Sequence, residues 1–273
     1  MSSNRTFKQR LGMETLIQAE EAQARMLRRN RKARRKDKSL RRISRCKRKN
    51  RCQTEACPVC RYRLRLNLIR ECRRLGFDKA PFTRVSFVPD KMLWAPGTLH
   101  QVDIKGYLEA LRKRLDRSAL ADLIMIGGLD ISFNTFENNA VGWQGHFYIL
   151  INAVDTAELR KAFTDAIKPD PSVERPFAFE KVNAHDFFKC LTYAYKNVFY
   201  RRSGHFEKRL KNDGTPRRRT SPQTLSNPLS IELDSWLAGY PVGARLFLRN
   251  VRRGRSPVYA RFALHLAKPF RDA

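Results

Sequence analysis

The alternation of apolar and polar residues is clearest in the middle of the chain. Residues 83–88 (TRVSFV) alternate and predict a strand, and residues 123–134 (LIMIGGLDISFN) predict a second one. Turn residues (FENNAVG) follow, so residues 141–152 are expected to pair with the second strand as a hairpin. Because side chains alternate between the two faces of a strand, one face of this hairpin is apolar. The other face carries Asp130, Ser132 and Asn134.

Helical spacing of apolar residues marks the segments between and after these strands. Asp103 is expected to cap a helix with apolar residues every three or four positions. Asp155 and Glu158 form a capping-box pattern that begins the next helix. A short strand is expected near residues 177–182, and a last helix over about residues 184–200.

The predicted order is therefore strand, helix, hairpin, helix, strand, helix. An antiparallel sheet with helices on one face satisfies this order, so we expect an α+β fold for residues 81–202. Residues 203–228 are rich in Gly, Pro, Ser, Lys and Arg and are expected to form an exposed basic linker. With the C-terminal segment they make up residues 203–273.

The charge balance narrows the class of partner. The chain carries 56 Lys and Arg against 26 Asp and Glu, a formal net charge of +30. DNA or RNA is the usual partner for such a balance. A membrane partner is not expected, because no apolar run approaches the roughly 18 residues that span a bilayer. The first residues (MSSNRTFKQR) lack the apolar core of a secretory signal, so a cytoplasmic location is expected.

The positive charge is most concentrated before the middle of the chain. Of the 24 residues from Arg28 to Arg51, 15 are Lys or Arg, and Asp37 is the only acid. We expect residues 1–45 to form a basic, helical arm that stays mobile until phosphates neutralise it. A merely solvated helix is the alternative.

Residues 46–80 hold a cysteine cluster and a further basic segment. The cluster follows the spacing C-x5-C-x4-C-x2-C and consists of Cys46, Cys52, Cys57 and Cys60. Four thiolates at such spacing predict a closed, tetrahedral, structural Zn²⁺ site, and the surrounding cations favour the thiolate form. Free thiols and a redox CxxC pair are the alternatives. Cys72 and Cys190 stand apart and are expected to be buried apolar residues.

Several motifs together resemble a known family. They are C-x4-CPVC followed by arginines, the strand TRVSFV, the pair GLDISFN and GWQGHFYILI, and the segment FFKCLTYAYKNVFY, which contains Y-x-x-K. In this order they are similar to the rolling-circle replication initiators of plasmids and phages, in the HUH endonuclease superfamily. The resemblance covers about residues 46–200. It implies a ferredoxin-like, HUH-type sheet and a protein that nicks single-stranded DNA or an origin hairpin with a tyrosine and a divalent metal.

The resemblance also implies a catalytic Mg²⁺ or Mn²⁺ site, with one departure from the family pattern. Asp130 takes the acidic position, and alignment on Trp143 places the two metal histidines of the family at His146 and Tyr148. Only one histidine is therefore kept. Gln144 lies on the same strand face and is a further weak ligand. The alternative is that His146 is an ordinary strand histidine and that the metal site is lost.

Tyr193 is the expected nucleophile. On the predicted helix it lies on the face opposite the apolar stripe, one turn from Lys196, whose ammonium can steady a phenolate or a phosphate. Tyr195 lies nearer the apolar stripe and is expected to be packed. The alternative for Tyr193 is a surface tyrosine that stacks on a base.

Three functions fit these features. The first is a replication initiator that nicks DNA. The second is a non-catalytic, zinc-containing DNA-binding relative that has lost its metal site. The third is an RNA-binding or transcriptional zinc protein, which would use the same charge and cysteine cluster.

Overall fold

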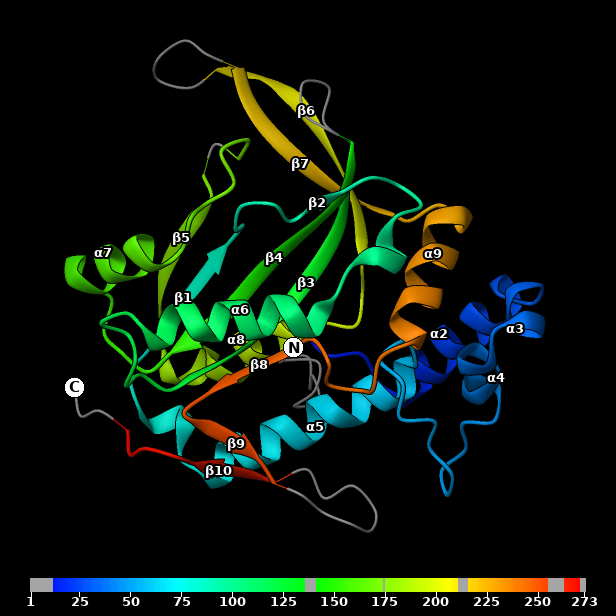
Figure 1. The fold of residues 1–273 in the computed structure, drawn as a ribbon, viewed down its shortest axis with the longest axis horizontal. Coiled ribbons are helices and arrows are strands. Elements are labelled where there is room, and N and C mark those ends of the chain that lie inside the picture. Colours follow the sequence, from blue (N-terminus) through cyan, green and yellow to red (C-terminus); the bar gives the residue numbers. More distant parts are fainter. Residues whose placement is uncertain (1–11, 136–140, 174, 211–215, 255–262, 271–273) are drawn as a thin grey trace, which may run out of the picture.

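The computed structural model describes residues 12–135, 141–173, 175–210, 216–254 and 263–270, and it shows a mixed α+β fold around a mostly antiparallel sheet (Figure 1). The sheet has the strand order β5-β1-β4-β3-β6-β7, with β2 against β4 and β8 against β3. Its strands are β1 (Phe82–Phe87), β2 (Leu93–Trp94), β3 (Met125–Thr135), β4 (Gly142–Ile151), β5 (Phe177–Val182), β6 (Tyr200–Leu210), β7 (Pro216–Thr224) and β8 (Leu246–Arg249). A small second sheet pairs β9 (Val251–Arg253) with β10 (Leu264–Leu266).

Helices surround this sheet. They are α2 (Leu16–Arg29), α3 (Ala33–Lys36), α4 (Lys38–Ser44), α5 (Pro58–Arg74), α6 (Ile104–Asp116), α7 (Ala157–Ala166), α8 (Phe187–Ala194) and α9 (Asn227–Ala238), with short 3₁₀ turns at Phe77–Lys79, Leu99–Gln101 and Ala184–Asp186. Across the described residues, no helix combines the length and the apolar character needed to cross a bilayer.

The centre of the fold has the predicted order β1, α6, β3, β4, α7, β5. All its strand neighbours, in the order β5-β1-β4-β3, are antiparallel. Asp103 caps α6 as expected, with its carboxylate accepting from the Lys105 amide at 3.0 Å. The cap of α7 is Thr156 rather than Asp155, and Asp155 instead forms an ion pair with Arg160. The predicted hairpin turn falls on residues 136–140, outside the described residues.

Helices α6 and α7 lie on one face of the sheet. Phe163 of α7 packs edge-on against Phe87 of β1, with ring centroids 5.0 Å apart. The guanidinium of Arg112 on α6 lies over the ring of Phe247, which is on the same face of β8. The expectation of helices on one face therefore holds for α6 and α7, two of the three helices predicted for residues 81–202.

The opposite face is also covered, and here that expectation is wrong. Figure 1 shows α6 in front of β3 and β4, with α8 behind them. A Cβ atom at Gly128 would lie 2.7 Å from the Ala194 carbonyl oxygen of α8, so only glycine allows this approach. The long α5 packs beside α8, so β3 and β4 at the centre of the sheet have helices on both faces.

The helix predicted over 184–200 is shorter than expected. It ends at Ala194, and Tyr195 has left the helical region, with φ −125° and ψ 52°. The chain then runs into β6, which begins at Tyr200 and pairs with the end of β3 in parallel. Tertiary contacts of Tyr195, described below, outweigh the helical pattern of the sequence.

The prediction of a linker over 203–228 is wrong, because most of this segment forms a hairpin. Strands β6 and β7 pair from Tyr200 opposite Thr224 outward, and they project from the body of the protein (Figure 1). Pro216 and Pro222 lie in β7, the outermost strand, where a missing amide proton costs no ladder hydrogen bond inside the sheet. Helix α9 follows the hairpin.

The prediction of a mobile arm is also wrong for the described part of residues 1–45. Leu40 and Ile43 of α4 are completely buried. Arg29 and Asn30, at the end of α2, both donate to Asp234 of α9, at 2.5 and 2.7 Å. A few apolar residues on the inward sides of these helices are enough to hold them, while most of their cations remain at the surface.

Candidate metal centre and active site

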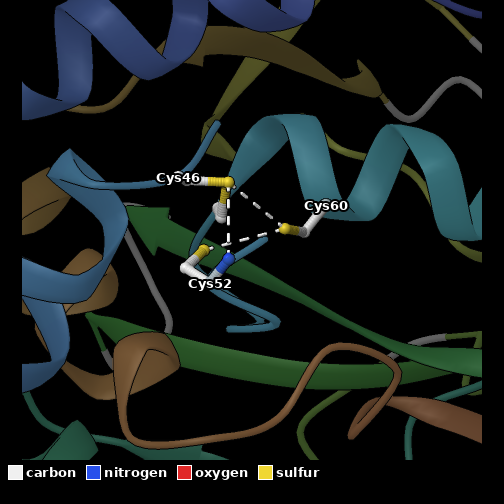
Figure 2. Close-up of side chains that lie close together, drawn as sticks. Cys46, Cys52 and Cys60 are labelled. Atoms are coloured by element: carbon white, nitrogen blue, oxygen red, sulfur yellow. Dashed lines mark hydrogen bonds between the residues drawn. The ribbon is translucent and has the colours of Figure 1, made fainter. Parts of the chain in front are cut away.

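Four cysteines converge between α4 and α5, as the spacing predicted. Within the described residues they are the only group of three or more His, Cys, Asp or Glu side chains close enough to hold one ion. Cys57 caps α5, Pro58 is its first residue, and Cys60 follows in the first turn. Figure 2 shows the sulfurs of Cys46, Cys52 and Cys60 turned toward a common centre.

The sulfur separations match tetrahedral coordination. The Cys46–Cys60 and Cys52–Cys60 sulfurs are 3.7 Å apart, and the Cys57–Cys46 sulfurs are 3.8 Å apart. A tetrahedron of sulfurs at about 2.3 Å from a central ion has edges of about 3.8 Å. All four are free cysteines. Hydrogen bonds from the other three thiols lower the pKa of Cys46 well below its ordinary value, and hydrogen bonds to Cys46 raise the pKa values of Cys57 and Cys60. The cluster can therefore hold a metal ion such as zinc.

A second cluster lies on the polar face of the β3–β4 hairpin. Asp130 and His146 are direct register partners, and the Asp130 Oδ2 atom lies 3.0 Å from His146 Nε2. The Lys196 ammonium forms an ion pair with the same carboxylate oxygen. Both Asp130 and His146 are buried. Three of the predicted site residues are therefore brought together, although Lys196 lies beyond the end of α8 rather than on it.

Burial and neighbouring charged groups shift the pKa values of Asp130 and His146 in this cluster. Burial raises the pKa of Asp130, but its interactions with His146 and Lys196 outweigh burial and hold the pKa below its ordinary value. Burial lowers the pKa of His146, and the attraction of Asp130 offsets only part of this. The lowered pKa of His146 favours its neutral imidazole form, the form that can bind a metal ion.

Asp130 and His146 fit two ligands of a divalent ion. Neighbouring ligands of an octahedral ion at about 2.1 Å are about 3.0 Å apart, which is the separation of this pair. The second carboxylate oxygen of Asp130, Oδ1, is buried and has no hydrogen-bond partner among the described residues. Its lone pairs remain available. With only two such ligands, water or substrate oxygens would fill the other positions.

The tyrosines divide as the sequence predicted. Tyr193 is 42% exposed, and its hydroxyl lies 3.4 Å from that of Tyr148. The Lys196 ammonium is 5.2 Å from the centre of the Tyr193 ring. Tyr195 is buried, and its hydroxyl donates to Glu55. Tyr148 packs edge-on against His146, with ring centroids 4.9 Å apart, so the five residues of the site form one continuous group.

Further polar residues extend this face toward the β6–β7 hairpin. Ser132 donates to Asn134, which donates to Gln144 across the β3–β4 pair, so the Gln144 oxygen is already engaged. Arg202 of β6 lies opposite Asn134 in the parallel pairing. Its positive charge contributes to lowering the pKa of His146 after the larger effect of burial. Arg202 was not predicted as a site residue, because the segment after it was expected to be a linker. The alternation of residues 200–206 was the only sequence signal for a strand there.

Sequence reasoning also missed a buried charge pair next to the cysteines. Glu55, between Cys52 and Cys57, is completely buried and lies 2.8 Å from the Nε atom of Arg245, which is also completely buried. The Tyr195 hydroxyl donates to the same carboxylate at 2.5 and 2.7 Å. Glu55 is the only acid between Asp37 and Glu71 in this basic part of the chain, and this was its only signal in the sequence.

Comparisons with known proteins give no family for the chain. No family model matches it, and no similar curated protein or solved structure was found. A functional assignment therefore rests on the residues and their geometry.

Proposed function

We propose that the protein nicks single-stranded DNA through Tyr193 and thereby initiates replication or transfer of a DNA element. One observation carries the proposal. The half-exposed Tyr193, a buried Asp130–His146 pair and the Lys196 ammonium meet on one face of the β3–β4 hairpin. A nucleophile, two metal ligands and a cation are the groups that phosphodiester transfer requires.

Tyr193 is suited to the nucleophilic role by its position. In the reaction its oxygen forms a bond to phosphorus while one bridging P–O bond breaks, giving a covalent phosphotyrosine and a free hydroxyl end. The hydroxyl proton leaves to solvent, which Tyr193 reaches. The Lys196 ammonium over the ring stabilises the developing phenolate and the charge on the phosphate.

Asp130 and His146 would hold Mg²⁺ or Mn²⁺, which acts as a Lewis acid on a non-bridging phosphate oxygen. The free lone pairs of Asp130 Oδ1 and the neutral imidazole of His146 are the properties that ligands of such an ion need. Arg202, the register partner of Asn134, would bind a neighbouring phosphate in this proposal.

Three wider features support the proposal. The central unit, with strand order β5-β1-β4-β3 and α6 and α7 on one face, has the arrangement of a ferredoxin-like fold, on which HUH enzymes are built. The cysteine centre is a structural Zn²⁺ site in this proposal. The net charge of +30 suits a DNA partner.

The test is a covalent-adduct assay. The full chain is incubated with single-stranded DNA and Mn²⁺, and adducts are separated under denaturing conditions. Wild type should form an adduct and Tyr193→Phe should form none, while DNA affinity changes little because only the attacking oxygen is removed. The matched control is Tyr107→Phe, since the Tyr107 hydroxyl lies on α6, on the other face of the sheet. An adduct that maps to another tyrosine would refute the role of Tyr193.

A non-catalytic DNA-binding protein is the second candidate. Two observations favour it: Tyr148 stands where a third ligand is needed, and its hydroxyl lies within hydrogen-bonding distance of the Tyr193 hydroxyl. In that case the same face binds single-stranded DNA, with Tyr193 stacking on a base. Intact binding without any adduct, with Mg²⁺ or Mn²⁺, would identify this function.

A further inference from the structure

The cysteine loop contacts the segments that carry the candidate active site. Three backbone contacts tie it to the turn before β8: the Glu55 amide donates to Tyr240 at 2.8 Å, the Val242 amide donates to Gln53 at 2.8 Å, and Thr54 forms a bridge with Pro241. The Glu55 carboxylate then accepts from the Gly243 amide at 2.7 Å. The loop and the turn thus form one hydrogen-bonded unit.

Arg245 extends this unit to β3. Its Nε atom donates to Glu55, and its Nη1 atom donates to the Leu129 carbonyl at 2.8 Å. The Leu129 amide donates in return to the Arg245 carbonyl at 2.9 Å. Leu129 immediately precedes Asp130, so Arg245 holds the backbone next to the candidate metal ligand through both the amide and the carbonyl of Leu129.

The same unit holds the backbone that carries Lys196. The Nη2 atom of Arg245 donates to the Lys196 carbonyl at 3.3 Å. Tyr195, the preceding residue, donates its hydroxyl to Glu55, and the Arg245 guanidinium lies 4.8 Å from the centre of its ring. These contacts coincide with the point at which α8 ends, and they set the direction in which Lys196 leaves the helix.

We propose that the cysteine centre is a positioning element for the candidate active site, with Glu55, Arg245 and Tyr195 transmitting its geometry to Asp130 and Lys196. Metal binding orders the loop on both sides of Glu55. The ordered carboxylate fixes Arg245, whose planar guanidinium joins β3 to the segment after α8. The effect on catalysis rests on the proposed function, whereas the structural coupling between the cysteine loop and the backbone at Asp130 and Lys196 does not.

Hydrogen exchange of the full chain without DNA tests the coupling. Removing the cysteine-bound metal with a chelator should speed exchange about 10- to 100-fold in peptides covering 125–131, 194–197 and 241–246, because hydrogen bonds to charged groups are lost there. Peptides from β1 and β5 should exchange at the same rate before and after the metal is removed. Glu55→Gln, with its metal content unchanged, should raise exchange in the same peptides.

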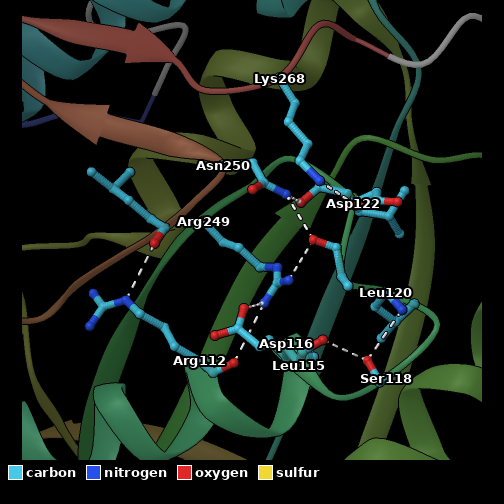
Figure 3. Close-up of polar contacts among 12 residues, drawn as sticks. Arg112, Leu115, Asp116, Ser118, Leu120, Asp122, Arg249, Asn250 and Lys268 are labelled. Atoms are coloured by element: carbon cyan, nitrogen blue, oxygen red, sulfur yellow. Dashed lines mark hydrogen bonds and ion pairs between the residues drawn. The ribbon is translucent and has the colours of Figure 1, made fainter.

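The matched control breaks another carboxylate–arginine pair. Figure 3 shows Asp116 of α6 beside Arg249 of β8, in a network that includes Asn250, Asp122 and Lys268. Asp116→Asn removes that pair on the far side of the sheet and should leave residues 194–197 unchanged.

Three results would overturn the proposal. One is a wild-type protein whose exchange rises only within 46–60, or nowhere, on chelation. Another is a metal-loaded Glu55→Gln protein with wild-type exchange at 125–131 and 194–197. If Glu55→Gln fails to fold, Tyr195→Phe decides, because Glu55 still neutralises Arg245. The third result is a Tyr195→Phe protein whose hydrogen exchange at 194–197 is no faster than that of wild type.

The adduct assay separates this proposal from the proposed function. If wild type forms an adduct, Glu55→Gln should lower the rate of adduct formation with DNA affinity unchanged. If wild type forms no adduct, the exchange results still test the coupling independently of the proposed function.

Discussion

The Tyr148 and Tyr193 hydroxyls lie 3.4 Å apart, although the two residues come from β4 and α8 and are 45 positions apart in the chain. Their rings meet edge-on, with centroids 4.9 Å apart. Burial raises the pKa of Tyr148, followed by its contact with Tyr193, so its hydroxyl stays neutral and is a poor metal ligand. Position 148 therefore contacts both His146, a candidate metal ligand, and Tyr193, the proposed nucleophile.

Replacing Tyr148 with histidine should strengthen divalent-metal binding. Position 148 shares its strand face with His146, so an imidazole there adds a third ligand beside Asp130. We expect the Kd for Mn²⁺ to fall about tenfold, or about 1.4 kcal/mol, in a calorimetric titration. Adduct formation should increase with it.

Tyr148→Phe is the control for this change. It removes the same contact with Tyr193 but supplies no ligand, so its affinity for Mn²⁺ should equal that of wild type. Equal Mn²⁺ affinity in the histidine and phenylalanine variants would mean that Asp130 and His146 do not form part of a metal site.

Purified protein should carry about one zinc per chain in the cysteine centre. Cys57→Ser replaces a buried ligand and should lower the zinc content well below that of wild type, measured by metal analysis of reduced protein. It should also lower the melting temperature, because metal binding stabilises the folded state. Cys190→Ser is the control, since Cys190 lies outside the cluster and should not change the zinc content. Freshly purified wild type without zinc would contradict the assignment.

Local sequence patterns predicted the central unit because its signals are local. The alternation in residues 123–134 and the Asp103 cap depend on residues a few positions apart. Asp130 and His146 could be grouped for the same reason, since a hairpin places them on one face. Four cysteines within 15 residues likewise identified the metal centre.

The failures arose where distant residues decide the structure. The helical pattern of the sequence continues to Tyr200, but helix α8 ends at Ala194. The next residue, Tyr195, makes a buried contact with Glu55, which is 140 residues away in the chain. Glu55 and Arg245 are 190 residues apart, and no local pattern pairs them. Charge density suggested mobility for residues 1–45, although Leu40 and Ile43 are enough to hold α4 in the core.

Leu40→Ala should test whether the basic N-terminal helices belong to the folded body. Leu40 is completely buried in α4, so its truncation should lower the free energy of unfolding by about 2–5 kcal/mol. Urea unfolding followed by circular dichroism measures the change. Arg41→Ala, at the exposed neighbouring position, should stay within about 0.5 kcal/mol of wild type. Equal midpoints for the two variants would show that α4 does not pack on the body.

The exposed cations around α3 should contribute to DNA binding through phosphate contacts. A variant with glutamine in place of Arg31, Lys32, Arg35 and Lys36 keeps the buried residues of α2 and α4. Each phosphate contact contributes roughly 0.7–0.9 to the slope of log affinity against log salt concentration, so losing all four contacts should lower the slope by about 3. Fluorescence anisotropy with single-stranded DNA over a range of salt concentrations measures it.

The control for the salt experiment removes the same charge from another surface. Glutamine in place of Lys105, Lys113, Arg114 and Arg117 neutralises four exposed cations on and next to α6, on the face of the sheet opposite Tyr193. Because long-range charge is screened beyond about 10 Å at 0.1 M salt, only cations in contact with phosphates should alter the slope. The α6 variant should therefore keep the wild-type slope. Equal slopes for both variants would mean that DNA does not run along α3.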